Sequence, residues 1–163
     1  MDDGMIIDII YATNKLFEKE WEKDCIIKPD AYELEETVKD IFTNGGCALY
    51  GEYLYDILKD FGAELGKSND HVFVRINDKY YDAVSGYEPN SNLLKTLAEK
   101  NGFLVYDLET KEGKEQFEYY KNSICKVYSI PSFKEASKIL NGIKEVMKKR
   151  IDDKIKNSSI TLK

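Results

Sequence analysis

The dipeptide Asn77–Asp78 constrains the fold of this chain more than any other short segment. It separates two runs, His71–Ile76 and Tyr80–Val84, that are rich in apolar, aromatic and β-branched residues, as half-buried strands are. Asn and Asp both tolerate positive φ, so the pair suits a tight two-residue hairpin turn. The sequence therefore predicts an antiparallel hairpin centred on this turn.

The turn also predicts which residues of the hairpin share a face. Counting back from a two-residue turn pairs Phe73 with Asp82. The same count pairs His71 with Val84. His71 and Asp82 then lie on one face as diagonal neighbours, about 7 to 8 Å apart at the backbone and within reach of a histidine side chain. A three-residue loop would instead place Asp82 on the opposite face.

Helices are predicted on both sides of the hairpin, because apolar residues recur there at helical spacing. Asp30, followed by Glu33 three residues later, has the spacing of a capping box, and Gly62 and Gly102 can end the helices before them. The expected helices are Asp3 to about Lys19, Asp30 to just before Asn44, Cys47 to about Phe61, Ser91–Lys100, Glu112–Lys121 and a C-terminal helix over residues 131–157.

The remaining segments complete an α+β fold, with helices packed around a small antiparallel sheet. Phe103–Leu108 and Lys126–Ile130 have the composition of short strands, whereas Gly62–Asp70 resembles a loop. With 163 residues, the chain is long enough to bury a core of its own, so we expect one domain over residues 1–163.

The charge balance argues against a nucleic-acid partner. The net charge is -6, whereas phosphate binding requires clustered Lys and Arg. The basic run near the C-terminus alternates with acidic residues, which favours a solvated helix face; it comprises Lys144, Lys148, Lys149 and Arg150. No apolar stretch approaches the roughly 18 residues of a membrane span, so we expect no membrane partner.

The cysteines argue against a bound metal or a disulfide framework. Cys25, Cys47 and Cys125 are widely spaced and form no Cys-x-x-Cys pair, and zinc usually takes four ligands. The first residues lack the basic segment of a signal peptide. We therefore expect no cofactor, no metal and a reduced, cytoplasmic setting.

Cys47 follows Gly45 and Gly46 and opens a predicted helix, which is where a thiolate is stabilised by the helix dipole. The glycines, lacking Cβ atoms, would let a substrate carbonyl approach the free N–H groups there. The Asn44 side chain is a candidate second donor of an oxyanion hole. A free cysteine is also often a plain core residue, and Cys47 shares a helical face with Tyr50.

His71 is the only histidine of the chain, so it is the one side chain that could act as imidazole base towards a thiol. Asp82 could hold the other ring nitrogen and fix the tautomer. Asp70 is a weaker candidate for that task, since adjacent strand residues point to opposite faces. The candidate catalytic residues are therefore Cys47, His71 and Asp82.

The chain order of these residues resembles the papain-like and transglutaminase-like superfamily of cysteine peptidases. A cysteine opens a helix after a Gly-rich turn, a strand begins with histidine, and the hairpin partner carries aspartate. The stretch HVFVRINDKYYDAVSG is similar to a segment of small phage and bacterial proteins of that group. The resemblance covers residues 44–86, a catalytic-core segment, and implies a papain-like core; the glutamine and tryptophan typical of papain-type sites are missing.

The resemblance implies catalytic roles for the three residues and an enzyme that hydrolyses an amide or peptide bond through a Cys thioester. Its substrate would be a peptide, a protein or another amide or acyl compound. A deamidase or acyltransferase would use the same residues. The alternative is a noncatalytic binding or phage-accessory protein with a decayed papain-like site. Substrate and oligomeric state stay open.

Overall fold

The computed structural model describes the backbone of residues 1–127 and 132–161, and the side chains of residues 1–124 and 133–157. Within these residues the chain has an α+β fold, as the sequence predicts, with a single four-stranded antiparallel sheet surrounded by helices. No helix of the described part combines the length and hydropathy that a membrane crossing requires.

Six α-helices and two short 3₁₀ helices accompany the four strands in the described residues. In chain order the elements are α1 (Asp3–Lys23), α2 (Ala31–Thr43), α3 (Cys47–Leu58), η1 (Lys59–Phe61), β1 (Glu64–Ser68), β2 (His71–Ile76), β3 (Lys79–Tyr81), η2 (Ala83–Gly86), α4 (Ser91–Asn101), β4 (Leu104–Tyr106), α5 (Lys111–Val127) and α6 (Ser132–Thr161).

The predicted hairpin is confirmed, and its register agrees with the sequence over the first three pairs. Asn77 and Asp78 have φ of 53° and 62° and form the two-residue turn, and pairing runs as far as Val74 with Tyr81. The predicted pairs of Phe73 with Asp82 and of His71 with Val84 are wrong. The strand ends at Tyr81 because the carboxylate of Asp82 accepts a hydrogen bond from the backbone N–H of Val84 and starts η2.

The predicted loop Gly62–Asp70 is also wrong, because β1 lies within it. The sheet order is β3-β2-β1-β4, so β1 is a central strand between β2 and β4. A Cβ on Gly66 would lie only 2.5 Å from the ring of Phe103, so glycine is needed there for close packing. Gly66, which in the sequence suggests a loop, is therefore required for the close packing of a strand.

Other boundaries differ from the sequence-based ones. α1 continues to Lys23, and β4 covers only Leu104–Tyr106 of the longer strand expected. The predicted strand Lys126–Ile130 is wrong at its first two residues, which belong to α5, and its last three lie outside the described residues. The C-terminal helix begins at Ser132 and extends to Thr161; Pro131 lies outside the described residues.

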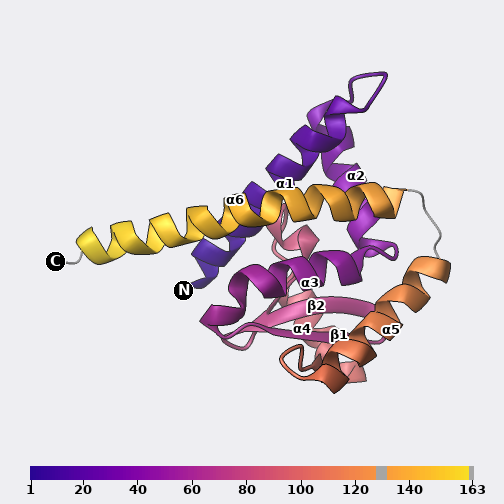
Figure 1. The fold of residues 1–163 in the computed structure, drawn as a ribbon, viewed down its shortest axis with the longest axis vertical. Helices are drawn as coiled ribbons and strands as arrows, with labels where there is room; N and C mark the ends of the chain where they lie inside the picture. Colours follow the sequence, from indigo (N-terminus) through magenta and orange to yellow (C-terminus); the bar gives the residue numbers. More distant parts are fainter. Residues whose placement is uncertain (128–131, 162–163) are drawn as a thin grey trace.

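The helices lie on both faces of the sheet. Figure 1 shows α3 across β1 and β2, with α6 passing over α1. Gly51 of α3 packs so closely on β2 that a Cβ there would meet Cγ1 of Val72 at 2.7 Å. On the other face a second apolar cluster joins Phe73 and Tyr80 to Leu94 and Ala98 of α4. The close approach of α3 and β2 fixes the N-terminal half of α3 relative to the start of β2.

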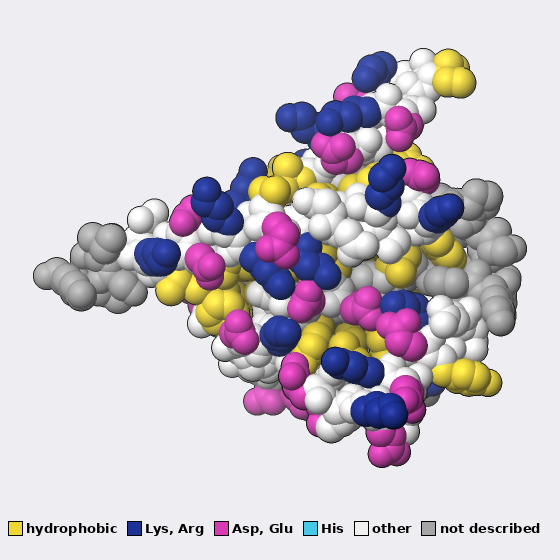
Figure 2. Space-filling model, viewed as in Figure 1, with side chains coloured by type: hydrophobic (Ala, Val, Ile, Leu, Met, Phe, Trp, Pro, Cys, Tyr) yellow, Lys and Arg dark blue, Asp and Glu magenta, His cyan; other side chains and the backbone are white. Residues whose placement is uncertain are grey.

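The surface carries both signs of charge. Figure 2 shows Lys and Arg side chains interspersed with Asp and Glu over the visible face. Of the basic run in α6, Lys144 and Lys148 both pair with Asp56 of α3, at 3.0 and 3.5 Å. These two lysines therefore attach α6 to α3 instead of forming only a solvated face.

Candidate functional site

The turn between α2 and α3 requires both of its glycines. Gly45 has φ of 98°, a conformation that residues with a Cβ rarely adopt. Gly46 donates its N–H to the carbonyl of Ile41, and a Cβ at Gly46 would lie 2.3 Å from that oxygen. This tight turn makes Cys47 the first residue of α3, as the sequence predicts.

Cys47 is buried, with 4% of its surface exposed, and its thiol lies at the end of the β1–β2 hairpin. Sγ donates to the backbone oxygen of Asp70 at 3.8 Å, and the thiol also contacts the imidazole of His71. Within the described residues no side chain caps this end of α3. The first N–H groups of any helix also lack an acceptor inside the helix. The positive end of the α3 dipole therefore lies at the thiol.

His71, the first residue of β2, connects the thiol to a carboxylate. Its Nε2 donates to Oδ2 of Asp82 at 2.8 Å. The imidazole also contacts Cys47, and since Nε2 is occupied by Asp82, Nδ1 is the nitrogen left for the thiol. The structure thus brings the three predicted residues together in the order thiol, imidazole, carboxylate.

Three residues that the sequence analysis did not place at the site hold Asp82: Val84, Ser85 and Asn90. Oδ1 accepts hydrogen bonds from the backbone N–H of Val84 at 3.0 Å and from Nδ2 of Asn90 at 2.7 Å. Ser85 accepts from the backbone N–H of Asp82 at 3.0 Å. The side chains of Asp82 and Ser85 form a capping box at the start of η2, and their spacing is the sequence signal that could have revealed it.

Asn14 of α1 is a further residue that sequence reasoning missed. Its Nδ2 donates to the backbone oxygen of Ala83, next to Asp82, and its Oδ1 accepts from the hydroxyl of Tyr50 on α3. Asn14 and Tyr50 are both almost fully buried. One buried amide therefore connects the helix that carries Cys47 to the segment that carries Asp82.

The pKa of His71 is raised to about 9. Burial is the largest single influence and lowers the pKa, but the hydrogen bond that His71 donates to Asp82, its interaction with Cys47 and the charge of the Asp82 carboxylate raise the pKa further than burial lowers it. The imidazole therefore carries a proton at neutral pH. A protonated imidazole beside a thiol favours the thiolate form.

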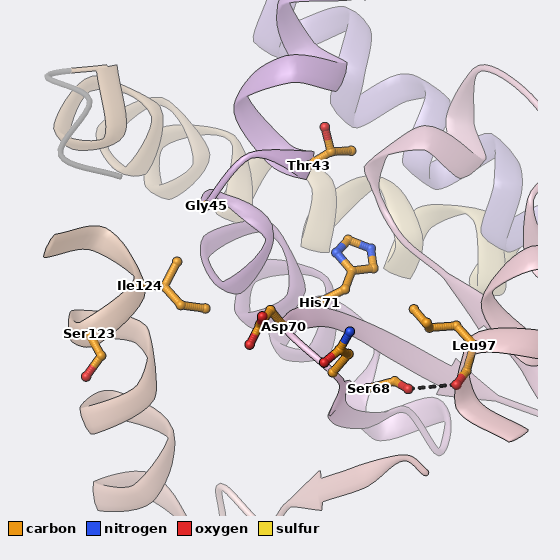
Figure 3. A pocket seen from close by; sticks show the side chains of 9 residues that line it. Thr43, Gly45, Ser68, Asp70, His71, Leu97, Ser123 and Ile124 are labelled. Atoms are coloured by element: carbon orange, nitrogen blue, oxygen red, sulfur yellow. Dashed lines mark hydrogen bonds between the residues drawn. The ribbon is translucent and has the colours of Figure 1, made fainter. Parts of the chain in front are cut away.

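A cavity of about 480 Å³ opens beside His71. Its walls come from the α2–α3 turn, the β1–β2 hairpin, α4 and α5, and Figure 3 shows these side chains around it: Thr43, Gly45, Ser68, Asp70, His71, Leu97, Ser123 and Ile124, with Asn69 completing the lining. Cys47 is not among the lining residues, whereas His71, which contacts its thiol, is one of them.

Asn44, the candidate oxyanion donor, ends α2 and is exposed; it does not line the cavity. Of the other cysteines, Cys25 is half-buried and donates to the carbonyl of Trp21, and the side chain of Cys125 lies outside the described residues. Over the described part of the chain, no group of three or more His, Cys, Asp or Glu side chains could hold a metal ion.

Comparison with known protein families gives a match. The family model described as Phage YunG-like protein matches residues 26–128. That range contains Cys47, His71 and Asp82, whereas α1 and α6 lie outside it. No curated protein and no solved structure matches the chain.

Proposed function

The chain belongs to the Phage YunG-like protein family, and we propose that it is a thiol-dependent acyl-transfer enzyme. In this proposal it hydrolyses an amide or peptide bond through a thioester on Cys47. The observation that carries the proposal is the contact of one imidazole with both a thiol and a buried carboxylate. Such a set is the arrangement that activates cysteine nucleophiles.

The first half of the reaction forms the thioester. The Cys47 thiolate attacks the substrate carbonyl carbon, forming a C–S bond and pushing the carbonyl electron pair onto oxygen. As the C–N bond breaks, the protonated His71 gives its proton to the leaving nitrogen, and an amine departs. Asp82 keeps the ring oriented and stabilises its charged form.

The second half returns the enzyme to its starting state. Neutral His71 takes a proton from water, whose oxygen attacks the thioester carbonyl. The C–S bond then breaks, releasing a carboxylic acid and restoring the thiolate beside the imidazolium. If another amine or hydroxyl replaces water, the same residues perform acyl transfer, and a glutamine side chain as substrate gives deamidation.

The N-terminus of α3 supplies the electrostatic stabilisation in this proposal. Its unpaired N–H groups lie next to the nucleophile, and the positive end of the helix dipole favours both a thiolate and a developing oxyanion. Gly45 leaves the approach to these groups free of a side chain. Asn44 contributes only if its exposed side chain turns towards the cavity on substrate binding.

We extend the proposal to a papain-like core and a reducing, cytoplasmic setting. The core is supported by the order of a helix that begins with cysteine, a strand that begins with histidine, and an aspartate after the hairpin partner. The setting is supported by the chemistry, because a cysteine nucleophile works only while it stays reduced.

The second candidate is a noncatalytic binding protein with a decayed site. One observation favours it: Cys47 is almost fully buried, its thiol is engaged with the carbonyl of Asp70, and it does not line the cavity. Under this candidate the three residues form a structural network.

A chromogenic ester separates the two candidates. With p-nitrophenyl acetate, the enzyme should release p-nitrophenolate in a burst followed by steady turnover, and mass spectrometry should find one acetyl group on Cys47. Cys47→Ala should abolish both signals, whereas the matched control Cys25→Ser should leave them unchanged. Absence of acetylation at Cys47, or equal turnover by Cys47→Ala, would favour the binding protein.

A further inference from the structure

We propose that the cavity beside His71 binds a positively charged group of the substrate, such as a lysine or arginine side chain or a free amine, and that Asp70 recognises it. This inference rests on the proposed function, because it names the substrate class of that same site. Asp70 lines the cavity and directly precedes His71 in the sequence.

The charge inventory of the cavity supports a cationic ligand. Among the nine residues that line it, Asp70 is the only acidic one. The positive charge of the His71 imidazole is balanced by the carboxylate of Asp82. The described residues form several ion pairs, such as Lys39 with Glu88 and Lys121 with Glu52. None of these pairs involves Asp70. Asp70 therefore presents a negative charge that no cation of the described chain neutralises.

The backbone of Asp70 has a fixed position relative to the nucleophile. Ser68 and His71 pair across the hairpin, which leaves Asn69 and Asp70 as its turn, and Asn69 takes a positive φ of 56°. The Ser68 hydroxyl donates to the carbonyl of Leu97 at 2.9 Å, which attaches the turn to α4. The backbone oxygen of Asp70 itself accepts the Cys47 thiol. A cation bound by Asp70 would thus lie at the same end of the hairpin as the reacting sulfur.

The rest of the wall suits an aliphatic stem that ends in a cation. Leu97 from α4 and Ile124 from α5 supply apolar surface, and Figure 3 shows the Asp70 side chain on the side of the cavity that faces α5. Lysine and arginine bury such stems along apolar surface while their charged ends meet a polar partner. A volume of about 480 Å³ is large enough for one such side chain and the adjoining peptide group.

Charge-bearing thiol reagents test this inference without a known substrate. The protein would carry Cys25→Ser and Cys125→Ser, so that only Cys47 reacts. Three methanethiosulfonates are compared at neutral pH: aminoethyl (cationic), sulfonatoethyl (anionic) and methyl (neutral). In each case the thiolate attacks the reagent sulfur, a mixed disulfide forms, and methanesulfinate leaves.

We expect the cationic reagent to react faster than the anionic one, and Asp70→Asn to lower the ratio of the cationic to the neutral rate about fivefold, the effect of two unit charges a few ångströms apart at a water-exposed site. Asp70→Glu, which keeps the charge, should keep the ratio. The matched control Asp78→Asn removes the same charge from the turn at the other end of β2 and should leave the ratio unchanged.

The outcomes separate the two proposals. If the neutral reagent modifies Cys47 no faster than it modifies a small free thiol, the proposed function fails. If Cys47 reacts rapidly but the ratio is the same in Asp70→Asn as in the parent, the function stands and the role of Asp70 is refuted. Equal loss of the ratio in Asp70→Asn and Asp70→Glu would also refute it, because it would trace the effect to the shape of the turn.

Discussion

Nε2 of His71 lies 2.8 Å from Oδ2 of Asp82, although the two residues do not pair in the sheet. The contact forms because the chain leaves β3 after Tyr81 and Asp82 starts η2, so that the carboxylate turns back towards the first residue of β2. The other carboxylate oxygen is held by Val84 and Asn90. The imidazole is therefore oriented by a carboxylate that is itself fixed.

Asp82→Asn should lower the pKa of His71 from about 9 towards its ordinary value of 6.5. The substitution removes the charge of Asp82, the largest influence that raises the pKa, while burial, which lowers it, and the interaction with Cys47 remain; asparagine keeps an oxygen acceptor for the N–H of Val84. Because the chain has one histidine, its ring gives a single set of NMR signals to titrate. The control Asp78→Asn should leave the titration unchanged, and an unshifted pKa in Asp82→Asn would refute the role of Asp82.

The stability of the protein should depend on pH through the same residue. A histidine whose folded-state pKa is raised from 6.5 to about 9 stabilises the fold fully below pH 6.5, and this stabilisation is lost as pH rises through 9. Compared with His71→Gln, the wild type should therefore lose up to about 3 kcal/mol of unfolding free energy between these values. Urea unfolding at a series of pH values measures it; a difference that grows with pH would contradict the assignment.

Gly51→Ala should separate α3 from β2 and weaken the site. The new Cβ would lie 2.7 Å from Cγ1 of Val72, and such overpacking typically costs about 1 to 3 kcal/mol. Because Gly51 is one helical turn from Cys47, the thiol should also lose its contact with His71. Chemical unfolding and the rate of Cys47 alkylation measure the two effects.

The matched control is Gly142→Ala in the exposed part of α6, where a Cβ meets nothing within 4 Å. Alanine there should stabilise the protein by about 0.5 to 1 kcal/mol, since it favours the helix, and should leave alkylation unchanged. If the two glycine substitutions have equal effects, the close packing of α3 on β2 does not position the thiol.

The parts of the fold that the sequence predicts correctly depend on residues close together in the chain. Asp30 caps α2 through the N–H of Glu33, and Asn77 and Asp78 adopt the positive φ that their type allows. Cys47 begins α3 because Gly45 and Gly46 permit a turn that other residues would not. Each of these features depends on neighbours in sequence, so the residue types indicate it directly.

The parts that failed depend on contacts distant in sequence. Gly66 on its own indicates a loop. Its need for close packing against Phe103 becomes visible only when β1 and β4 are adjacent. Asn14 lies 69 residues from the carbonyl it binds, and no local pattern marks it as a support of the site. The sequence predicts the contact of His71 with Asp82, but the sheet pairing of Phe73 with Asp82 on which that prediction rests does not form.

The rate of Cys47 alkylation by iodoacetamide at about pH 6 tests the central claim most directly. If His71 holds the thiol as a thiolate, Cys47 should be alkylated before Cys25 and Cys125, faster than a small thiol with a pKa of about 8.5, and His71→Ala should slow the reaction at least about tenfold. Peptide mapping by mass spectrometry identifies the labelled residue. A Cys47 that reacts no faster than the free thiol, at a rate unchanged by His71→Ala, would contradict the proposed site.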